Sequence, residues 1–320
     1  MTVLVAGSYN FDQLFHTDQL PGPGETRLGE FSSAHGGKGF NQAVAAHRAG
    51  AEVRFVGAIG DDAAGAGAQA FAREEGLAAA WAQVSETPTG VAAVLTDASG
   101  ENQIVVAPGA NLALTAEMIA TPIAALGTGD VFLTQLESPV ETVNAGLAAA
   151  RARGALTILN PAPAPANDAA SLLAHADIIT PNETEFAALY QQLSSTTLPT
   201  DWTEAADDQL FHWFRELEVP GLALTLGAQG GYWAAGPALS HLAAEGGQRF
   251  TSPRVEAVDS TGAGDAFNGN LAAALSQGHG LGPSITRAAT AAALAVTVAG
   301  ATPAMPRASE VDRLLAPRVS

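Results

Sequence analysis

The 320-residue chain has no cysteine, which excludes disulfide bonds, thiolate metal sites and cysteine nucleophiles. Basic residues are also scarce: 14 Lys and Arg stand against 32 Asp and Glu, and Lys38 is the single lysine. The formal charge of −18 argues against nucleic acid or an anionic membrane as partner, because clustered Lys and Arg drive both kinds of binding. Hydrophobic residues make up an ordinary 47% of the chain, so we expect a folded protein with a sizeable core.

Long apolar runs are missing as well. The first residues carry no basic segment ahead of an apolar stretch, and the longest mildly apolar run, 288–301, contains Thr290 and Thr297. This run is shorter than the ~18 residues that a membrane span requires. We therefore expect a soluble, cytoplasmic protein.

Short β-branched or apolar runs alternate with alanine-rich stretches of helical spacing, which predicts a layered, mostly parallel α/β sheet with helices on both faces. The runs begin at Val3, Val53, Val131, Leu156, Asp177 and Leu222, and the helices are expected over 41–49, 63–75, 140–153, 184–191 and 207–217. Ligands of such sheets bind beyond the carboxyl ends of the strands. That rule places Asn10, Asp12, Glu137, Asn182, Glu185 and Gly227 along one rim.

Two regions break this alternation inside what we take as a single α/β domain over 1–320. Residues 13–35 and 87–107 suggest short strands joined by turns, hence a small antiparallel insert that forms a lid over the rim or merely extends the sheet. Residues 192–208 and 236–249 suggest loops without assignable chemistry.

A glycine-rich segment at 35–50 surrounds Lys38 with Gly36, Gly37 and Gly39 just before a helix. Glycines permit close backbone approach, and a helix start offers unpaired N–H donors, although many such loops are only tight turns. The segment is not a P-loop, because Gly39 stands where a hydroxyl residue should follow the lysine. Neither a dinucleotide-binding fingerprint, a GxSxG motif nor metal-ligand histidine spacing is present.

A second glycine turn at 258–275 opens a helix whose expected buried stripe is Phe267, Leu271 and Leu275. The N–H groups of Gly262, Ala263 and Gly264 can form an anion cradle. Asp265, just inside this helix, is either an ordinary N-terminal carboxylate or a base for an attacking hydroxyl.

The segment PNETE at 181–185 places Asn182 and Glu185 three residues apart at a helix start. Oxygen ligands of this type suit Mg²⁺ held partly through water. The spacing alone favours a helix cap instead, with Asn182 as N-cap and Glu185 at the third position.

Taken in order, these motifs make the chain resemble the ribokinase-like carbohydrate kinases, also called the phosphofructokinase-B family. GGKGFNQA is similar to the family's sugar-binding signature and DSTGAGD to its catalytic signature, and GSYNFD, PGPGET, QLESP, LNPAPA, PNETE and TLGAQGG follow the expected order. The resemblance implies ATP-dependent phosphorylation of D-ribose at O5, with Mg²⁺, with K⁺ as monovalent activator, and as a homodimer through the lid.

The resemblance also implies a role for each matching residue. Asp265 would be the catalytic base and Gly262, Ala263 and Gly264 the anion hole. The remaining sets are the sugar ligands Asn10, Asp12, Gly37, Lys38, Asn41 and Glu137; the nucleotide residues Asn182, Thr225, Leu226, Gly227, Ala228, Gln229, Gly230, Gly264 and Ala289; the magnesium residues Asn182 and Glu185; and the potassium residues Asp259, Thr261, Ala295, Val298, Gly300 and Ala304.

The chain departs from the family pattern at three positions: Ala304 replaces a hydroxyl residue near the cation, Ala289 replaces a histidine by the adenine, and Ser260 replaces threonine. Alternatives remain. Within the family the acceptor could be 2-deoxyribose, fructose or a nucleoside. The chain could also be a sugar-binding protein without catalysis, and a dehydrogenase is disfavoured by the missing fingerprint.

Overall fold

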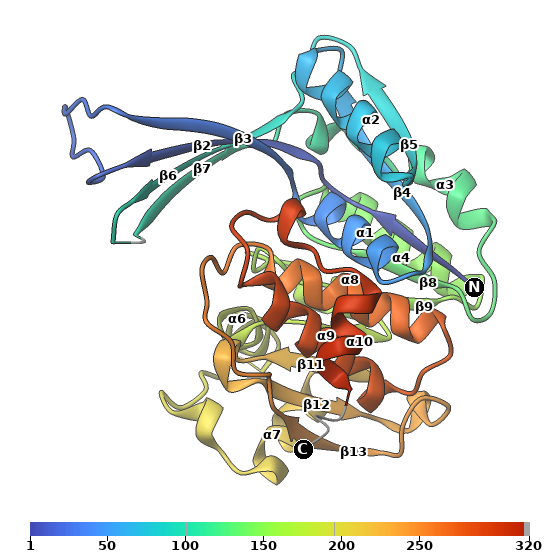
Figure 1. Ribbon diagram of the computed structural model, residues 1–320. Coiled ribbons are helices and arrows are strands. Elements are labelled where there is room, and N and C mark those ends of the chain that lie inside the picture. The colour runs from blue at the N-terminus through green and yellow to red at the C-terminus, as the bar shows by residue number, and fades with distance from the viewer. Residues whose placement is uncertain (100, 195, 317–320) are drawn as a thin grey trace.

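The computed structural model describes residues 1–99, 101–194 and 196–316. Its centre is a nine-stranded sheet with the strand order β13-β12-β11-β10-β9-β8-β1-β4-β5 (Figure 1). The pairs are parallel except at the β13-β12-β11 edge, which is antiparallel. The strands are β1 Thr2–Ala6, β4 Glu52–Gly60, β5 Ala78–Val84, β8 Val131–Thr134, β9 Leu156–Leu159, β10 Ile178–Ile179, β11 Gly221–Thr225, β12 Gly231–Ala235 and β13 Gly246–Phe250.

Helices cover both faces of this sheet, as expected, and each face has its own apolar core. One face carries α1 Lys38–Arg48, α2 Ala63–Glu75, α8 Ala263–Ser276 and α9 Leu281–Ala295, with α10 Ala308–Leu315 against α9. The other carries α3 Ala116–Ala124, α4 Val140–Ala152, α5 Ala169–Leu173, α6 Glu183–Ser194 and α7 Asp207–Glu216. Single 3₁₀ turns are η1 Gly109–Ala113, η2 Trp202–Glu204, η3 Gly227–Gln229, η4 Pro237–Leu239 and η5 Thr302–Ala304. Among the described residues no helix is both long and apolar enough to cross a bilayer.

A second, four-stranded sheet projects from the body of the molecule (Figure 1). It consists of β2 Asn10–Thr17, β3 Gly29–Gly36, β6 Gly90–Asp97 and β7 Asn102–Ala107 in the order β3-β2-β6-β7. The expectation of a purely antiparallel insert is wrong at its centre, because β2 and β6 pair in parallel. Two antiparallel hairpins, far apart in sequence, are thus joined side by side into one sheet.

The composition of the segment 236–249 predicted a loop, but the segment also contains regular structure. It contains η4 and the start of β13, which pairs with β12 along its whole length. The sequence of β13, Gly-Gly-Gln-Arg-Phe, has weak strand propensity, so its conformation depends on the partner strand.

The helices α1 and α8 cross in close contact at Gly269. A Cβ added there would lie 2.5 Å from both the Ala45 Cβ and the Gln42 carbonyl oxygen, so only glycine fits. All of α8 from Asp265 to Ser276 is buried. This crossing brings the start of α1 against the start of α8.

We predict that Gly269→Ala lowers the free energy of unfolding by about 1–3 kcal/mol, because a methyl group at this crossing overpacks two rigid helices. Chemical denaturation measures the change. Gly67→Ala is the matched control: it lies within α2, its Cβ would meet only ordinary contact at 3.8 Å, and it should raise stability by up to ~1 kcal/mol. Equal effects of the two substitutions would contradict the packing argument.

Candidate active site

The link between the two sheets is locked to the core by Asn111. Its Oδ1 accepts from the Tyr9 backbone N–H at 2.9 Å, and its Nδ2 donates to the Tyr9 carbonyl and to Asn10 Oδ1, both at 2.9 Å. Asn10 and Asp12 therefore lie at the fixed root of β2.

The glycine loop before α1 packs directly on this root. Gly37 has φ +87°, and a Cβ there would lie 2.7 Å from the Asn10 nitrogen, which explains the need for glycine. Glu137, after β8, accepts from the Ser8 hydroxyl at 2.6 Å and from the Lys38 backbone N–H at 3.0 Å. The loop thus brings Lys38 and Glu137 beside β2.

Asp265 is buried at the start of α8, after the left-handed N-cap Gly262 (φ +77°). Its Oδ2 accepts from Asn41 Nδ2 at 3.0 Å and its Oδ1 from Gln42 Nε2 at 2.9 Å. Asn41 is held in turn by the Thr302 hydroxyl, which donates to its Oδ1 at 2.6 Å. A carboxylate held in this way is fixed in orientation.

Four acidic groups and one ammonium lie close enough to act on one another's pKa. Burial, Glu137 and Asp265 raise the pKa of Asp12 to about 7. Burial also raises the pKa of Asp265, against the opposing effects of Lys38, Gln42 and Asn41. Burial lowers the pKa of Lys38, but Asp265, Glu137 and Glu185 outweigh it and raise the pKa overall. The ammonium therefore stays charged and is the positive centre of an otherwise acidic site.

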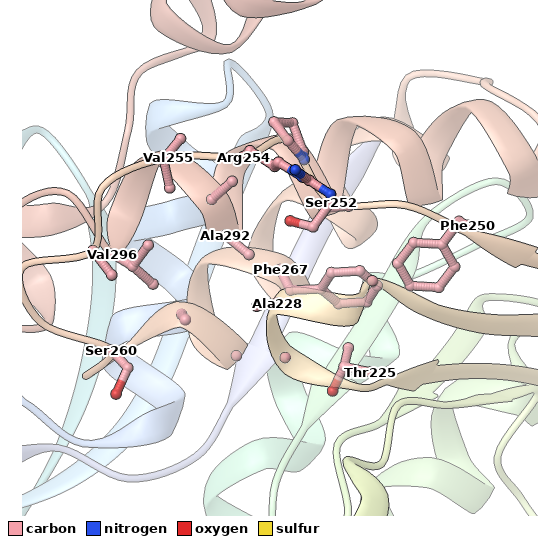
Figure 2. Close-up of a pocket in the computed structure, with 18 residues that line it drawn as sticks. Thr225, Ala228, Phe250, Ser252, Arg254, Val255, Ser260, Phe267, Ala292 and Val296 are labelled. Atoms are coloured by element: carbon pink, nitrogen blue, oxygen red, sulfur yellow. The ribbon is translucent and has the colours of Figure 1, made fainter. Parts of the chain in front are cut away.

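A largely apolar cavity of about 550 Å³ adjoins the start of α8 (Figure 2). Phe250 and Phe267 stack on one wall with ring centroids 6.1 Å apart, and Ser252 and Arg254 come from the chain after β13. Of the residues expected at the nucleotide, Thr225, Gly227, Ala228, Gly230, Gly264 and Ala289 line this cavity, together with Ala263 and Ser260. Asn182, Leu226 and Gln229 do not line it, although Asn182 forms a bridge with Thr225.

Asn182 and Glu185 form a reciprocal capping box at the start of α6. The Glu185 N–H donates to Asn182 Oδ1 and the Asn182 N–H donates to Glu185 Oε2, both at 2.9 Å. Burial raises the pKa of Glu185. The described residues include no group of three or more His, Cys, Asp or Glu side chains suited to a metal. A single carboxylate fits Mg²⁺ that is held mainly by water and phosphate oxygens.

The residues expected to hold a monovalent cation lie on two segments that Asp259 ties together. Its Oδ1 accepts from the Thr261 N–H at 2.9 Å and its Oδ2 from the Gly300 N–H at 2.8 Å. Val298 is half exposed, its N–H donates to the Ala295 carbonyl, and Ala304 is buried within η5. Thr261 directly precedes the Gly262 turn, and Ala301, next to Gly300, lies against it.

Sequence reasoning missed several polar residues at the site: Ser8, Gln42, Asn111, Gln135, Asn160 and Arg254. Gln42, Gln135 and Asn160 are buried uncharged amides within or next to regular elements. They lie inside the motifs GGKGFNQA, QLESP and LNPAPA, but the resemblance assigned them no role. A further signal is a polar residue where the helix or strand pattern calls for an apolar one.

Comparison with known proteins identifies the family of this chain. The family model for the pfkB family carbohydrate kinases matches residues 2–308. The chain belongs to the pfkB carbohydrate kinase family. It is therefore an α/β enzyme that transfers a phosphoryl group to a sugar or sugar-like alcohol.

Similar proteins match over nearly the whole chain. The ribokinase of Haemophilus influenzae is 34% identical over 317 residues, covering 98% of both chains, and that of Bacillus subtilis is 35% identical over 318 residues, covering 98% of this chain and 99% of the relative. A deoxyribokinase of Salmonella typhi is 31% identical over 320 residues, with 98% and 99% covered. Solved structures include the ribokinase of Thermotoga maritima (TM-score 0.85, 31% identity, 98% and 99% covered) and that of Arabidopsis thaliana in complex with ribose and ATP (0.80, 28%, 99% of each).

The raised pKa of Asp12 generates a prediction about stability. The folded pKa, about 7, exceeds the unfolded value of 3.8, so the folded state binds more protons between these values and stability falls as pH rises through that window. Asp12→Asn removes the buried charge. It should therefore raise the free energy of unfolding by about 1–3 kcal/mol at pH 8 and change it little at pH 4.

Thermal melts at both pH values test this, with Asp62→Asn as control. Burial raises the pKa of Asp62, but hydrogen bonds from Thr89 and Gly65 outweigh it and lower the pKa overall. Its charge is thus stabilising at pH 8, and its removal should lower Tm there. A loss of Tm at pH 8 in Asp12→Asn would contradict the assignment of a destabilising carboxylate.

Proposed function

We propose that the protein phosphorylates D-ribose at O5 with ATP, giving ribose 5-phosphate and ADP. The observation that carries the proposal is the buried Asp265 carboxylate, held by two amides at the start of α8. The charges of Lys38 and Glu137 act on it, and Ala263 and Gly264 directly before it line the apolar cavity. A hydroxyl acceptor on one side and a nucleotide on the other would meet at this carboxylate. Ribose and ATP are the ligands of the Arabidopsis relative, which supports both assignments.

The sugar side combines acceptors and donors, as a polyol requires. Asp12 and Glu137 accept hydrogen bonds from hydroxyls, while Lys38 and Asn41 donate, and Asn10 and Gly37 complete the wall. Asp265 takes the proton from the O5 hydroxyl as that oxygen attacks the γ-phosphorus of ATP, and the bond from the γ-phosphorus to the bridging oxygen breaks to release ADP. The N–H groups of Gly262, Ala263 and Gly264 stabilise the charge on the phosphoryl oxygens.

The nucleotide base occupies the apolar cavity between Phe267 and Ala289, and the segment from Thr225 to Gly230, including Leu226, Ala228 and Gln229, follows its ribose and phosphates. Mg²⁺ and K⁺ supply positive charge to the phosphates and the anion hole when bound. Asn182 and Glu185 would hold Mg²⁺ through water. The carbonyls and carboxylate of the Asp259–Gly300 region would hold K⁺, with one ligand fewer because of Ala304.

The acceptor itself is the testable part of this proposal, because deoxyribokinase is among the relatives. A coupled ADP-release assay with MgATP compares D-ribose, 2-deoxy-D-ribose, D-fructose and adenosine, with and without K⁺. Ribose should exceed 2-deoxyribose about ten- to a hundredfold in kcat/KM, because losing one hydroxyl leaves a buried polar partner unsatisfied. Comparable kcat/KM values for the two pentoses would contradict the assignment of the sugar-binding residues to ribose.

Asp265→Ala is the control for chemistry. It should abolish turnover and leave ribose binding measurable by calorimetry, because Asp12, Lys38 and Glu137 remain. Substantial residual activity would show that Asp265 is not the base. Ribose binding without turnover in the unchanged protein would favour the sugar-binding alternative.

The four-stranded sheet serves as a lid and as the contact between two subunits in this proposal. It exposes Phe31, Ile104, Val105 and Val106, and Leu28 directly before β3 is exposed as well, an apolar set unusual for a sheet in water. An exposed edge such as β7 is also suited to pairing with a second copy about a twofold axis.

Sedimentation at micromolar concentration should therefore show a dimer, and Val105→Glu should convert it to monomer. Met118→Glu places the same charge on an exposed apolar residue of α3, outside this sheet, and should leave the dimer intact. A monomer in the unchanged protein, or equal effects of the two variants, would contradict the lid contact.

A further inference from the structure

The two oxygens of Asp265 are held by different amides, and only one of those amides faces the proposed sugar. Asn41 reaches Oδ2 and is also an expected sugar ligand. Gln42 reaches Oδ1 from the next position of α1 and is fully buried, with 0% exposure. Gln42 therefore has no access to a ligand, and its contact with Asp265 needs another explanation.

The orientation of the Gln42 amide is set by two further amides. Gln135 Nε2 donates to Gln42 Oε1 at 2.6 Å, and Gln42 Nε2 donates to Asn160 Oδ1 at 3.0 Å as well as to Asp265. Asn160 Nδ2 donates to the Thr180 carbonyl at 3.1 Å, which fixes its own orientation by a backbone group. A reversed Gln42 amide would set oxygen against the Asp265 carboxylate and the Asn160 oxygen, and N–H against N–H at Gln135.

We propose that Gln42 is a positioning residue for Asp265, and that Gln135 and Asn160 orient Gln42 for this task. The proposal rests on the proposed role of Asp265 as base. Gln42 holds Oδ1 in place and stabilises the ionised form, so that the other oxygen is turned toward the acceptor hydroxyl. Stabilisation of the ionised form agrees with the electrostatics of Asp265: the Gln42 hydrogen bond lowers the pKa of this group, against the rise that burial causes.

The test uses Gln42→Met and Gln135→Met, which keep volume and remove the hydrogen bonds. The single-turnover rate of phosphoryl transfer should fall about 10- to 100-fold in Gln42→Met, with KM for ribose changed less than about threefold, since a hydrogen bond to a buried charge is lost without a ligand contact. The acid limb of the pH–rate profile should move up by about one pH unit. Gln135→Met should shift both quantities in the same direction by less.

Gln135→Met keeps the proposal testable if Gln42→Met does not fold. Gln135 does not contact Asp265, and its Oε1 is buried without a partner among the described residues, so its removal costs few hydrogen bonds. The double variant should match Gln42→Met alone, because Gln135 acts only through Gln42. If the losses of rate in the two single variants added up in the double variant, Gln135 would not act through Gln42, and the proposal would be wrong.

Asn270→Met is the matched control. Asn270 is a buried amide of the same helix as Asp265, and its Nδ2 donates to the Ala266 carbonyl at 3.0 Å. It should lower Tm and leave the acid limb in place. An unmoved acid limb in folded Gln42→Met and Gln135→Met would show a merely structural role and overturn the proposal. The base assignment fails separately, if Asp265→Ala retains turnover.

Discussion

The structure around the site depends on the presence of an unpaired carboxylate inside the protein. Asp265 has no Lys or Arg nitrogen within 4.0 Å among the described residues, so amide donors must compensate for the loss of water. Both donors, Asn41 and Gln42, are on α1, which forces the starts of α1 and α8 into close contact. Glycine at 269 permits that contact. The contact between the two helices and the hydrogen bonds to this carboxyl group therefore depend on each other.

The electrostatics of the pocket also limit what it can hold. Burial raises the pKa of Asp12 to about 7, and repulsion from Glu137 and Asp265 adds to this effect. These carboxylates surround the single ammonium of Lys38. A ligand that brought further negative charge to this side would increase the repulsion. A neutral polyol relieves it by donating hydroxyl hydrogens to the carboxylates. The acidic side therefore suits an unphosphorylated sugar, and in the proposed reaction the phosphates lie on the other side, at the N–H groups of the Gly262 turn.

The sequence predicted those parts of the fold that local pattern determines. The helix expected over 63–75 is α2 with the same bounds, because Asp62 caps its start and Gly76, in the left-handed region, ends it. Strand pairing between distant segments could not be predicted. No local sequence pattern shows that β2 pairs in parallel with β6, or that Gly246–Phe250 forms an edge of the main sheet. The charged and glycine residues of the site carry motif signals. Gln42 and Gln135 lie inside two of these motifs, but their roles could not be predicted, because an uncharged amide acquires its role only from its buried neighbours.

The same local geometry links the projecting sheet to the chemistry. Asn10 and Asp12 open β2, while Gly36 ends β3 directly before Gly37 and Lys38. A Cβ on Gly36 would lie 2.0 Å from Asp12 Oδ2, so the carboxylate rests against the end of the neighbouring strand. Asn111 fixes the chain at Tyr9 and Asn10. Asp12 is thus held between the fixed point at Asn10 and the end of β3, so the path of the four-stranded sheet at its root determines where the Asp12 carboxylate lies relative to Asp265.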